Sequence, residues 1–433
     1  MNYRFTIYNQ DATYDYPSID DVDDAIDYLK NPDSFRSFDI GLIELLKKKG
    51  YTGDINDIKD LSEYLVSRLK NINSQIEKET VISWLNGTHR PKIEPGSRNK
   101  IYEICFALNL SLDETSWFFR HVYYDRAFNC HTIEEAVYYY SFLHNVTYAE
   151  AQKIIQEVKN IPSATDSDAS ANYTQYVKNL IHECQSVAEL KEFLTQNKGN
   201  FNAWNKSALN ALNNYVSALI GSPESKSIID NLKRTIAQKR NNGKELPSLN
   251  LADYQTFGLL IQELIFDSKN PYECTAESPT EYVFEAIDNR NIRKNTFILE
   301  RILGTQKICR NNEKISIPYI VRNNFPSKKT MSDILSKDKI LVSKSYDSIR
   351  KMIVLLDFYQ FWVKVKLTTN NMEFPSDALP KIYLDEANAL LDQCGYEKLD
   401  AVNPYDWIFL CSARSKNPLE YFRAMINELS DDD

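Results

Sequence analysis

The side chains best suited to reading another molecule lie in one short stretch of this sequence. They recur at helical spacing and would share one face of a helix: Gln75, Lys78, Glu79, Ile82 and Asn86. Along the edge of a base pair, a lysine can donate to guanine, a glutamine can pair with adenine, and a glutamate can accept from cytosine. These residue types therefore suit contact with the edges of bases.

A short amphipathic helix is needed to present this face. Ser74 and Glu77 have the spacing of a capping box, which predicts that the helix begins at Gln75. The inward face carries the apolar residues Val81, Trp84 and Leu85. Gly87 supplies the left-handed residue on which helices commonly end. We therefore expect a helix from Gln75 to Asn86.

Basic side chains and further amphipathic helices flank this stretch. Residues 38–49 and 57–71 have helical periodicity, and another helix is expected after Pro95-Gly96-Ser97. Four cations in and after the intervening loop are expected to hold phosphates: Arg90, Lys92, Arg98 and Lys100. Residues 68–100 hold seven basic and three acidic side chains, whereas the whole chain has a formal net charge of −9. A basic module on an acidic body fits DNA bound in one orientation, and it also fits a solvated surface without a ligand.

The order of helix, turn, polar-faced helix, basic loop and apolar helix resembles the Cro/repressor-type (XRE-like) helix-turn-helix family over residues 57–119. The matching features are Ile82-Ser83-x-Leu85-x-Gly87, Arg90-Pro91 and the run ALNLSLDE at 107–114. The resemblance implies that the helix 75–86 enters the major groove of duplex DNA, with Gln75, Lys78, Glu79 and Ile82 nearest the bases. It also implies a transcriptional regulator of bacterial or prophage type.

A second set of residues could act on RNA. Arg126-Ala-Phe-Asn-Cys-His131 has an arginine-to-histidine spacing that resembles HEPN-type ribonucleases. That resemblance implies that His131 and Arg126 would position a 2′-hydroxyl and stabilise phosphate charge. The alternative function is then a phage-defence or toxin-type effector that uses the helix-turn-helix as an interaction module. Arg126 as a purely structural cation is the competing explanation, and we expect no enzyme activity.

Other chemical signatures are missing from the sequence. It has no glycine-rich phosphate loop, nucleophile elbow or H-E-x-x-H motif, and only 11 Gly. The seven Cys are scattered without a C-x-x-C pair, and His121, Cys130, His131 and His144 match no zinc spacing. No stretch is long and apolar enough to span a bilayer, and the N-terminus lacks a signal sequence. We expect a cytoplasmic protein with no cofactor, no metal and no membrane contact.

Composition and periodicity predict an all-α chain with one short N-terminal strand at Tyr3–Ile7. Five segments are expected: an acidic segment 1–35, the helix-turn-helix with a helical extension 36–160, a polar linker 161–175, a helical middle domain 176–305, and a C-terminal helical domain 306–433. Bundle-like helical packing should hold the domains together.

The C-terminal domain carries a weak internal repeat of residues 60–158. At an offset of 272, Leu384-Asp385-Glu386 lies under Leu112-Asp113-Glu114, Tyr396 under Tyr124, Lys398 under Arg126 and Asn417 under Asn145; Arg350 lies under Arg98 at an offset of 252. Duplication is one explanation, and chance similarity of two helical regions is the other. The second copy lacks the basic loop, so we expect it to support a homodimer or a protein partner rather than to read DNA.

Overall fold

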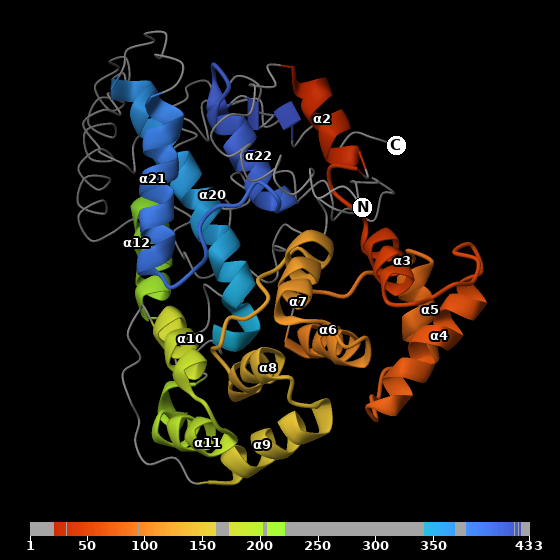
Figure 1. Ribbon diagram of the computed structural model, residues 1–433. Helices are drawn as coiled ribbons and strands as arrows, with labels where there is room; N and C mark the ends of the chain where they lie inside the picture. The colour runs from red at the N-terminus through yellow and green to blue at the C-terminus, as the bar shows by residue number, and fades with distance from the viewer. Residues whose placement is uncertain are drawn as a thin grey trace, which may run out of the picture.

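The computed structural model describes residues 21–31, 33–93, 95–161, 173–201, 206–220, 342–368, 378–419, 421–422 and 424–425. Over these ranges the chain forms fourteen α-helices and no strand, which confirms the all-α prediction (Figure 1). The strand expected at Tyr3–Ile7 and most of the predicted linker lie outside the described residues. Within those ranges, no helix is long and apolar enough to cross a membrane.

The first half of the chain forms eight helices before residue 161. They are α2 (Val22–Lys30), α3 (Phe38–Lys48), α4 (Ile58–Asn71), α5 (Lys78–Leu85), α6 (Pro95–Ala107), α7 (Leu112–Phe118), α8 (Ile133–His144) and α9 (Tyr148–Asn160). A π-helical turn, η1 (Phe119–Tyr123), continues α7. The helices expected at 38–49 and 57–71 are therefore confirmed as α3 and α4.

The second half of the described chain contributes six more helices. They are α10 (Tyr173–Glu183), α11 (Val187–Gln196), α12 (Lys206–Ile220), α20 (Val342–Thr368), α21 (Ala378–Gln393) and α22 (Pro404–Ala413). The middle domain is thus described only as far as residue 220. The Asn403-Pro404 pair predicts a helix start, with asparagine as the cap and proline as the first residue, and α22 begins in this way.

The predicted start of α5 is wrong by one turn. α5 begins at Lys78 with Glu77 as its N-cap residue, rather than at Gln75. The expected capping box does not form, because the Ser74 hydroxyl accepts from the backbone of Ile76 and donates to Glu103 of α6. A tertiary contact has replaced the local one. At the other end the prediction is confirmed, since Gly87 has a φ of 71° just after the C-cap.

A first hydrophobic core joins α3 to α11 and contains the segment that carries α5. Its fully buried side chains include Leu42 of α3, Leu65 of α4, Val81 of α5, Ile101 of α6 and Val137 of α8. α3 packs against η1 so closely that a Cβ atom at Gly41 would lie 2.5 Å from Val122. This contact requires glycine at position 41.

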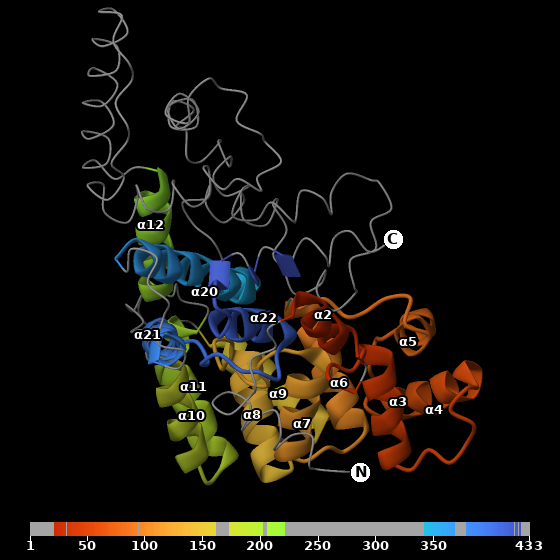
Figure 2. The same ribbon diagram turned by 90° about the horizontal axis from the view of Figure 1, so that it is seen from above.

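A second core joins α2 to α12, α20, α21 and α22. α2 precedes α3 in sequence, yet in both views it lies beside α22 (Figure 1, Figure 2). Tyr28 of α2 stacks on Trp407 of α22 with ring centroids 4.9 Å apart. The acidic N-terminal segment therefore contributes a helix to the C-terminal core, and residues 351–356, 358, 359 and 362 of α20 are buried.

Candidate nucleic-acid interface and the arginine clamps

α5 packs on one side against α3 and α4, and its other side faces away from these two helices. Val81, Trp84 and Leu85 are buried, and the Trp84 ring meets Phe38 of α3 at a centroid distance of 6.0 Å. In Figure 1 the helices α3, α4 and α5 lie together at one side of the molecule, away from α20 and α21. The polar face of α5 is thus directed away from the core that carries it.

The predicted base-reading residues differ in how they are presented. Glu79 is exposed, and Lys78 and Ile82 are half-buried on the outward side of α5. The Lys78 ammonium lies 3.2 Å from the Glu63 carboxylate of α4. Gln75 is exposed in the turn before α5, where its amide donates to the carbonyl of Asn73 at 3.3 Å. Gln75 therefore belongs to the turn rather than to the helix.

The four predicted phosphate ligands are not equivalent. Lys92 is exposed and Lys100 is half-buried. Arg90 turns inward, donates to the carbonyl of Tyr123 and lies over the ring of Tyr124, with its guanidinium carbon 5.2 Å from the ring centroid. The basic loop therefore presents one exposed lysine, and Arg90 attaches the loop to η1.

Arg98 is buried in a cluster that we name the first clamp: Arg98, Asp125 and Glu135. Its Nη1 pairs with Asp125, its Nε lies 2.9 Å from Glu135 Oε1, and its Nη2 donates to the carbonyls of Arg126 and Ala127 at 2.9 and 3.3 Å. Glu135 also accepts from the backbone of Asn129 at 3.0 Å. Only 7% of the Arg98 side chain is exposed. The phosphate contact predicted for Arg98 therefore does not fit its position.

The first clamp contains two carboxylates for one guanidinium. Burial lowers the pKa of Arg98, but Asp125 and Glu135 outweigh this effect and raise it well above the usual value. Burial raises the pKa of Asp125, and the opposing pull of Arg98 does not cancel this effect. Arg98 thus stays charged and joins α6, the loop 124–132 and α8 in one buried network.

A second clamp, formed by Arg350 and Asp406, has the same plan in the other core. Arg350 of α20 donates from Nη1 and Nη2 to the two Asp406 oxygens, each at 2.8 Å. Its Nη2 also donates to the carbonyls of Glu397 and Lys398 at 3.2 Å. Asp406 accepts from the backbone of Asp400 at 3.0 Å. The side chains of Arg350 and Asp406 are 12% and 1% exposed.

The two clamps agree residue by residue along their loops. In each, the carboxylate is the third residue of a helix, α8 or α22, and accepts from the amide six positions earlier. In each, the arginine donates to the carbonyls eight and nine positions before that carboxylate. Eleven positions before it stands a left-handed residue, Tyr124 with φ 58° or Gly395 with φ 71°. The matching offset is 271 rather than the predicted 272, whereas Arg98 and Arg350 correspond as predicted.

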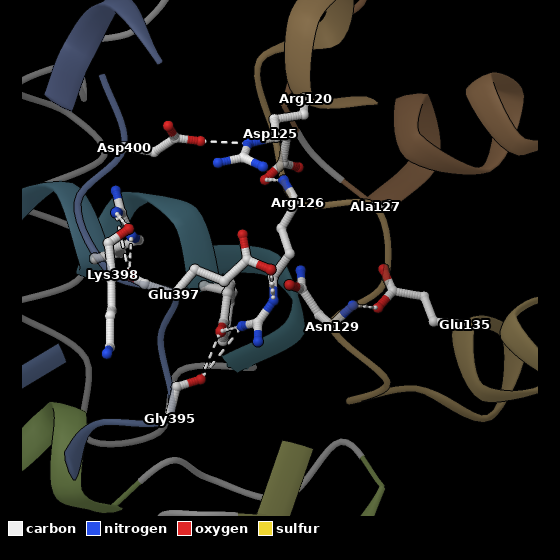
Figure 3. Close-up of polar contacts among 12 residues, drawn as sticks. Arg120, Asp125, Arg126, Ala127, Asn129, Glu135, Gly395, Glu397, Lys398 and Asp400 are labelled. Carbon is white, nitrogen blue, oxygen red and sulfur yellow. Dashed lines mark hydrogen bonds and ion pairs between the residues drawn. The ribbon is translucent and has the colours of Figure 1, made fainter. Parts of the chain in front are cut away.

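The two loops meet each other between the cores, as Figure 3 shows. Arg126 donates from Nη1 to the Tyr346 hydroxyl at 2.7 Å and to the Gly395 carbonyl at 3.4 Å, and its Nε lies 3.0 Å from Glu397 Oε1. Arg120 of η1 pairs with Asp400. A small pocket of about 50 Å³ lies at this junction, and it has room only for a few waters.

Arg126 and His131, the residues of the ribonuclease hypothesis, are brought to the same tyrosine. The ring centroids of His131 and Tyr346 lie 4.7 Å apart. Arg126 donates a hydrogen bond to the hydroxyl of the same tyrosine. Burial lowers the pKa of His131 to about 3, and Arg126 adds to this effect. His131 is therefore neutral near pH 7, and Arg126 contacts protein groups on the C-terminal loop. This arrangement fits a junction between two units rather than a pair that holds an RNA phosphate.

Sequence reasoning missed the acidic partners of both clamps. Asp125, Glu135 and Asp406 lie 27, 37 and 56 positions from their arginines, and the proximity arises from the fold. A local signal did exist for Glu135, because Thr132 caps α8 by accepting from its amide. Across the described ranges, no group of three or more His, Cys, Asp or Glu side chains is arranged to hold a metal ion.

Comparison with known proteins gives no family for this chain. None of the protein-family models, curated proteins or solved structures compared with it matches. The function must therefore be argued from the chain's own residues.

Proposed function

We propose that the chain is a sequence-specific DNA-binding protein in which α4 and α5 act as a helix-turn-helix and α5 enters the major groove. A regulator of bacterial or prophage type is the role that the resemblance implies. The observation that carries the proposal is the two-sided character of α5: three apolar residues are buried against α3 and α4, while Lys78, Glu79 and Ile82 lie on the outward side. A recognition helix packs one face against its own domain and presents side chains on the opposite face to the major groove.

The ion pair between Lys78 and Glu63 does not prevent base contact. The two side chains are 41% and 52% exposed, so solvent screens the pair. An exposed pair of this kind contributes about 0–1 kcal/mol, so the lysine can be released to a guanine edge at little cost. Glu79, which is also exposed, would accept from a cytosine and reject other bases.

Phosphate contacts are fewer than the sequence suggested. Lys92 is the exposed cation of the loop after α5, and Lys100 of α6 is half-buried. Arg90 and Arg98 have internal partners. We therefore expect a shallow dependence of the affinity on salt, with a contribution from only one or two lysines.

Selection of bound fragments from genomic DNA, followed by fluorescence anisotropy over a salt series, tests the proposal. Lys78→Ala should relax the preference at one base pair, at a cost of about 1–3 kcal/mol on the preferred sequence. Lys92→Ala should weaken binding to all sequences and reduce the salt slope by about one. Lys153→Ala, an exposed lysine of α9, is the matched control and should bind like the wild type.

Absence of enriched fragments together with absence of salt-dependent binding would overturn the DNA proposal. A salt-dependent interaction without sequence preference would restrict it to phosphate contacts. In that event α5 would not be a reading helix.

A further inference from the structure

Both clamps fix loops of equal length, and these loops contact each other where the two cores meet. The first loop is Tyr124–Thr132 and the second is Gly395–Asn403. Each begins at a left-handed residue and ends at a residue whose side chain caps the next helix. Their carbonyls and amides are bound at the same positions by an arginine and a carboxylate. Chance similarity between helical regions gives no reason for hydrogen bonds to recur at matching positions in two loops.

We propose that the two loops are copies of one docking surface and that they bind each other within the chain. The unit α6 to α8 would then find its partner in the unit α20 to α22 of the same molecule. The surface through which such a unit would form a homodimer is already occupied. This inference is independent of DNA binding, and it assigns the C-terminal domain an internal partner instead of an external one.

The contact at the centre of the junction supports this arrangement. At the offset of 271 that relates the clamps, Arg126 corresponds to Glu397. These two residues form an ion pair at 3.0 Å. When two copies of one surface pack about a two-fold axis, the residue nearest the axis meets its own counterpart. A like pair at that place would contain two equal charges, whereas this chain has one charge of each sign.

Flanking contacts add further polar pairs to the junction. Arg120 pairs with Asp400, and the Asn403 amide donates to the Tyr124 carbonyl at 3.3 Å. Tyr346 accepts from Arg126 and donates to the Gly395 carbonyl at 2.9 Å. Interfaces of this polar kind between units of one chain separate more easily than a continuous apolar core. The clamps hold each loop in its bound shape, which lowers the ordering cost of docking.

Charge reversal at the central pair tests the proposal in the full chain. Arg126→Glu places two glutamates at the junction, and Glu397→Arg places two arginines there. Each single variant should show a lowered melting temperature and a larger hydrodynamic radius than the wild type. The double variant R126E/E397R restores opposite charges within one chain and should recover both values.

Mixing the two single variants provides the direct test of the docking surface. The glutamate introduced by R126E in one chain then faces the arginine introduced by E397R in the other chain. At the second contact of the pair, the unchanged Glu397 of the first chain faces the unchanged Arg126 of the second. Sedimentation velocity should show a species of twice the monomer mass in the mixture and in neither variant alone. A mixture of Lys153→Glu and Glu77→Arg, two exposed positions away from the junction, is the control and should stay monomeric.

Rescue within the chain or between chains supports the proposal, even if the single variants fold poorly. The proposal is overturned if the double variant is no better than the singles and the mixture forms no two-chain species. It is also overturned if both single variants match the wild type in melting temperature and radius.

Discussion

In both clamps a buried arginine fixes a loop, but the two clamps differ in the number of carboxylates that face the arginine. In the first clamp one arginine faces two carboxylates, and these lie on different elements, the loop 124–132 and α8. In the second clamp one arginine faces one carboxylate and contacts both of its oxygens at 2.8 Å. The first is therefore a three-way junction with an excess of negative charge, and the second is a balanced pair. Removal of the arginine should show this difference.

Arg98→Met should cause the largest loss of stability. It leaves two buried carboxylates without a cation, and the cost of breaking a buried pair is about 3–5 kcal/mol. We expect the upper end of that range, measured by denaturant unfolding at pH 7. Arg120→Met removes an arginine that is 44% exposed and should cost about 1 kcal/mol or less. Equal losses for the two variants would show that the clamp contributes no more than a surface pair.

Arg350→Met should lower the free energy of unfolding by less than Arg98→Met, because it leaves one buried carboxylate without its cation instead of two. We expect about 3 kcal/mol by the same measurement. The double substitution Arg350→Met with Asp406→Leu removes both charges and should recover much of the loss. If Arg350→Met were the more damaging of the two arginine variants, charge balance would not explain the difference between the clamps.

Two single groups, Asp357 and His131, should give pH dependences of opposite sign, and Asp357 of α20 is the group in the second core. Its carboxylate accepts from the Tyr215 hydroxyl at 2.7 Å, and burial raises its pKa to about 6. The folded state holds this proton where the unfolded state, with a pKa near 3.9, has lost it. The resulting stability is complete below about pH 4 and is lost as the pH rises through 6. Asp357→Asn should remove about 2 kcal/mol of pH dependence between pH 4.5 and 7.

The test is urea unfolding at the two pH values, with Asp385→Asn, at an exposed carboxylate of α21, as the control. A wild-type slope retained in Asp357→Asn would assign the dependence to another group.

His131 should give the smallest effect, with the reverse sign. Its pKa is lowered to about 3, mainly by burial, so the folded state excludes a proton that the unfolded imidazole accepts near pH 6.5. Stability from this group is complete above about pH 6.5 and is lost as the pH falls toward 3. Because the ring is only half-buried, we expect His131→Phe to recover about 1 kcal/mol at pH 4.5.

Phenylalanine keeps a ring against Tyr346, so the change between pH 7 and pH 4.5 in the difference from the wild type reports the charge. An equal difference at both pH values would point to packing or to a lost contact instead of titration.

Helices with local signals could be predicted from the sequence, and contacts across the fold could not. The periodicity of residues 38–49 and 57–71 and the cap at Asn403 involve neighbours within a few positions, and the structure confirms them. The start of α5 failed because the Ser74 hydroxyl has a partner on α6. Local spacing carries no information about such a partner.

Two of the four predicted phosphate ligands, Arg90 and Arg98, turn out to have internal partners for a related reason. In the sequence, Arg98 follows a basic loop and therefore looks like part of a basic surface patch. The sequence does not reveal that Asp125 and Glu135 lie beside it. Lys92 keeps the exposed position that was expected. The proposed internal repeat rested partly on the alignment of Arg98 with Arg350, and the clamp loops correspond at an offset of 271 instead of the predicted 272.

The placement of α2 has a consequence for the order of folding. The core built by α20, α21 and α22 also contains Ala25, Ile26 and Leu29 of α2. α2 therefore cannot bury these residues until the later helices have been synthesised. The unit from α3 to α9 has its partners nearby in sequence and can form while synthesis continues. On the ribosome, the second core would then close last, when α22 emerges and α2 packs against it.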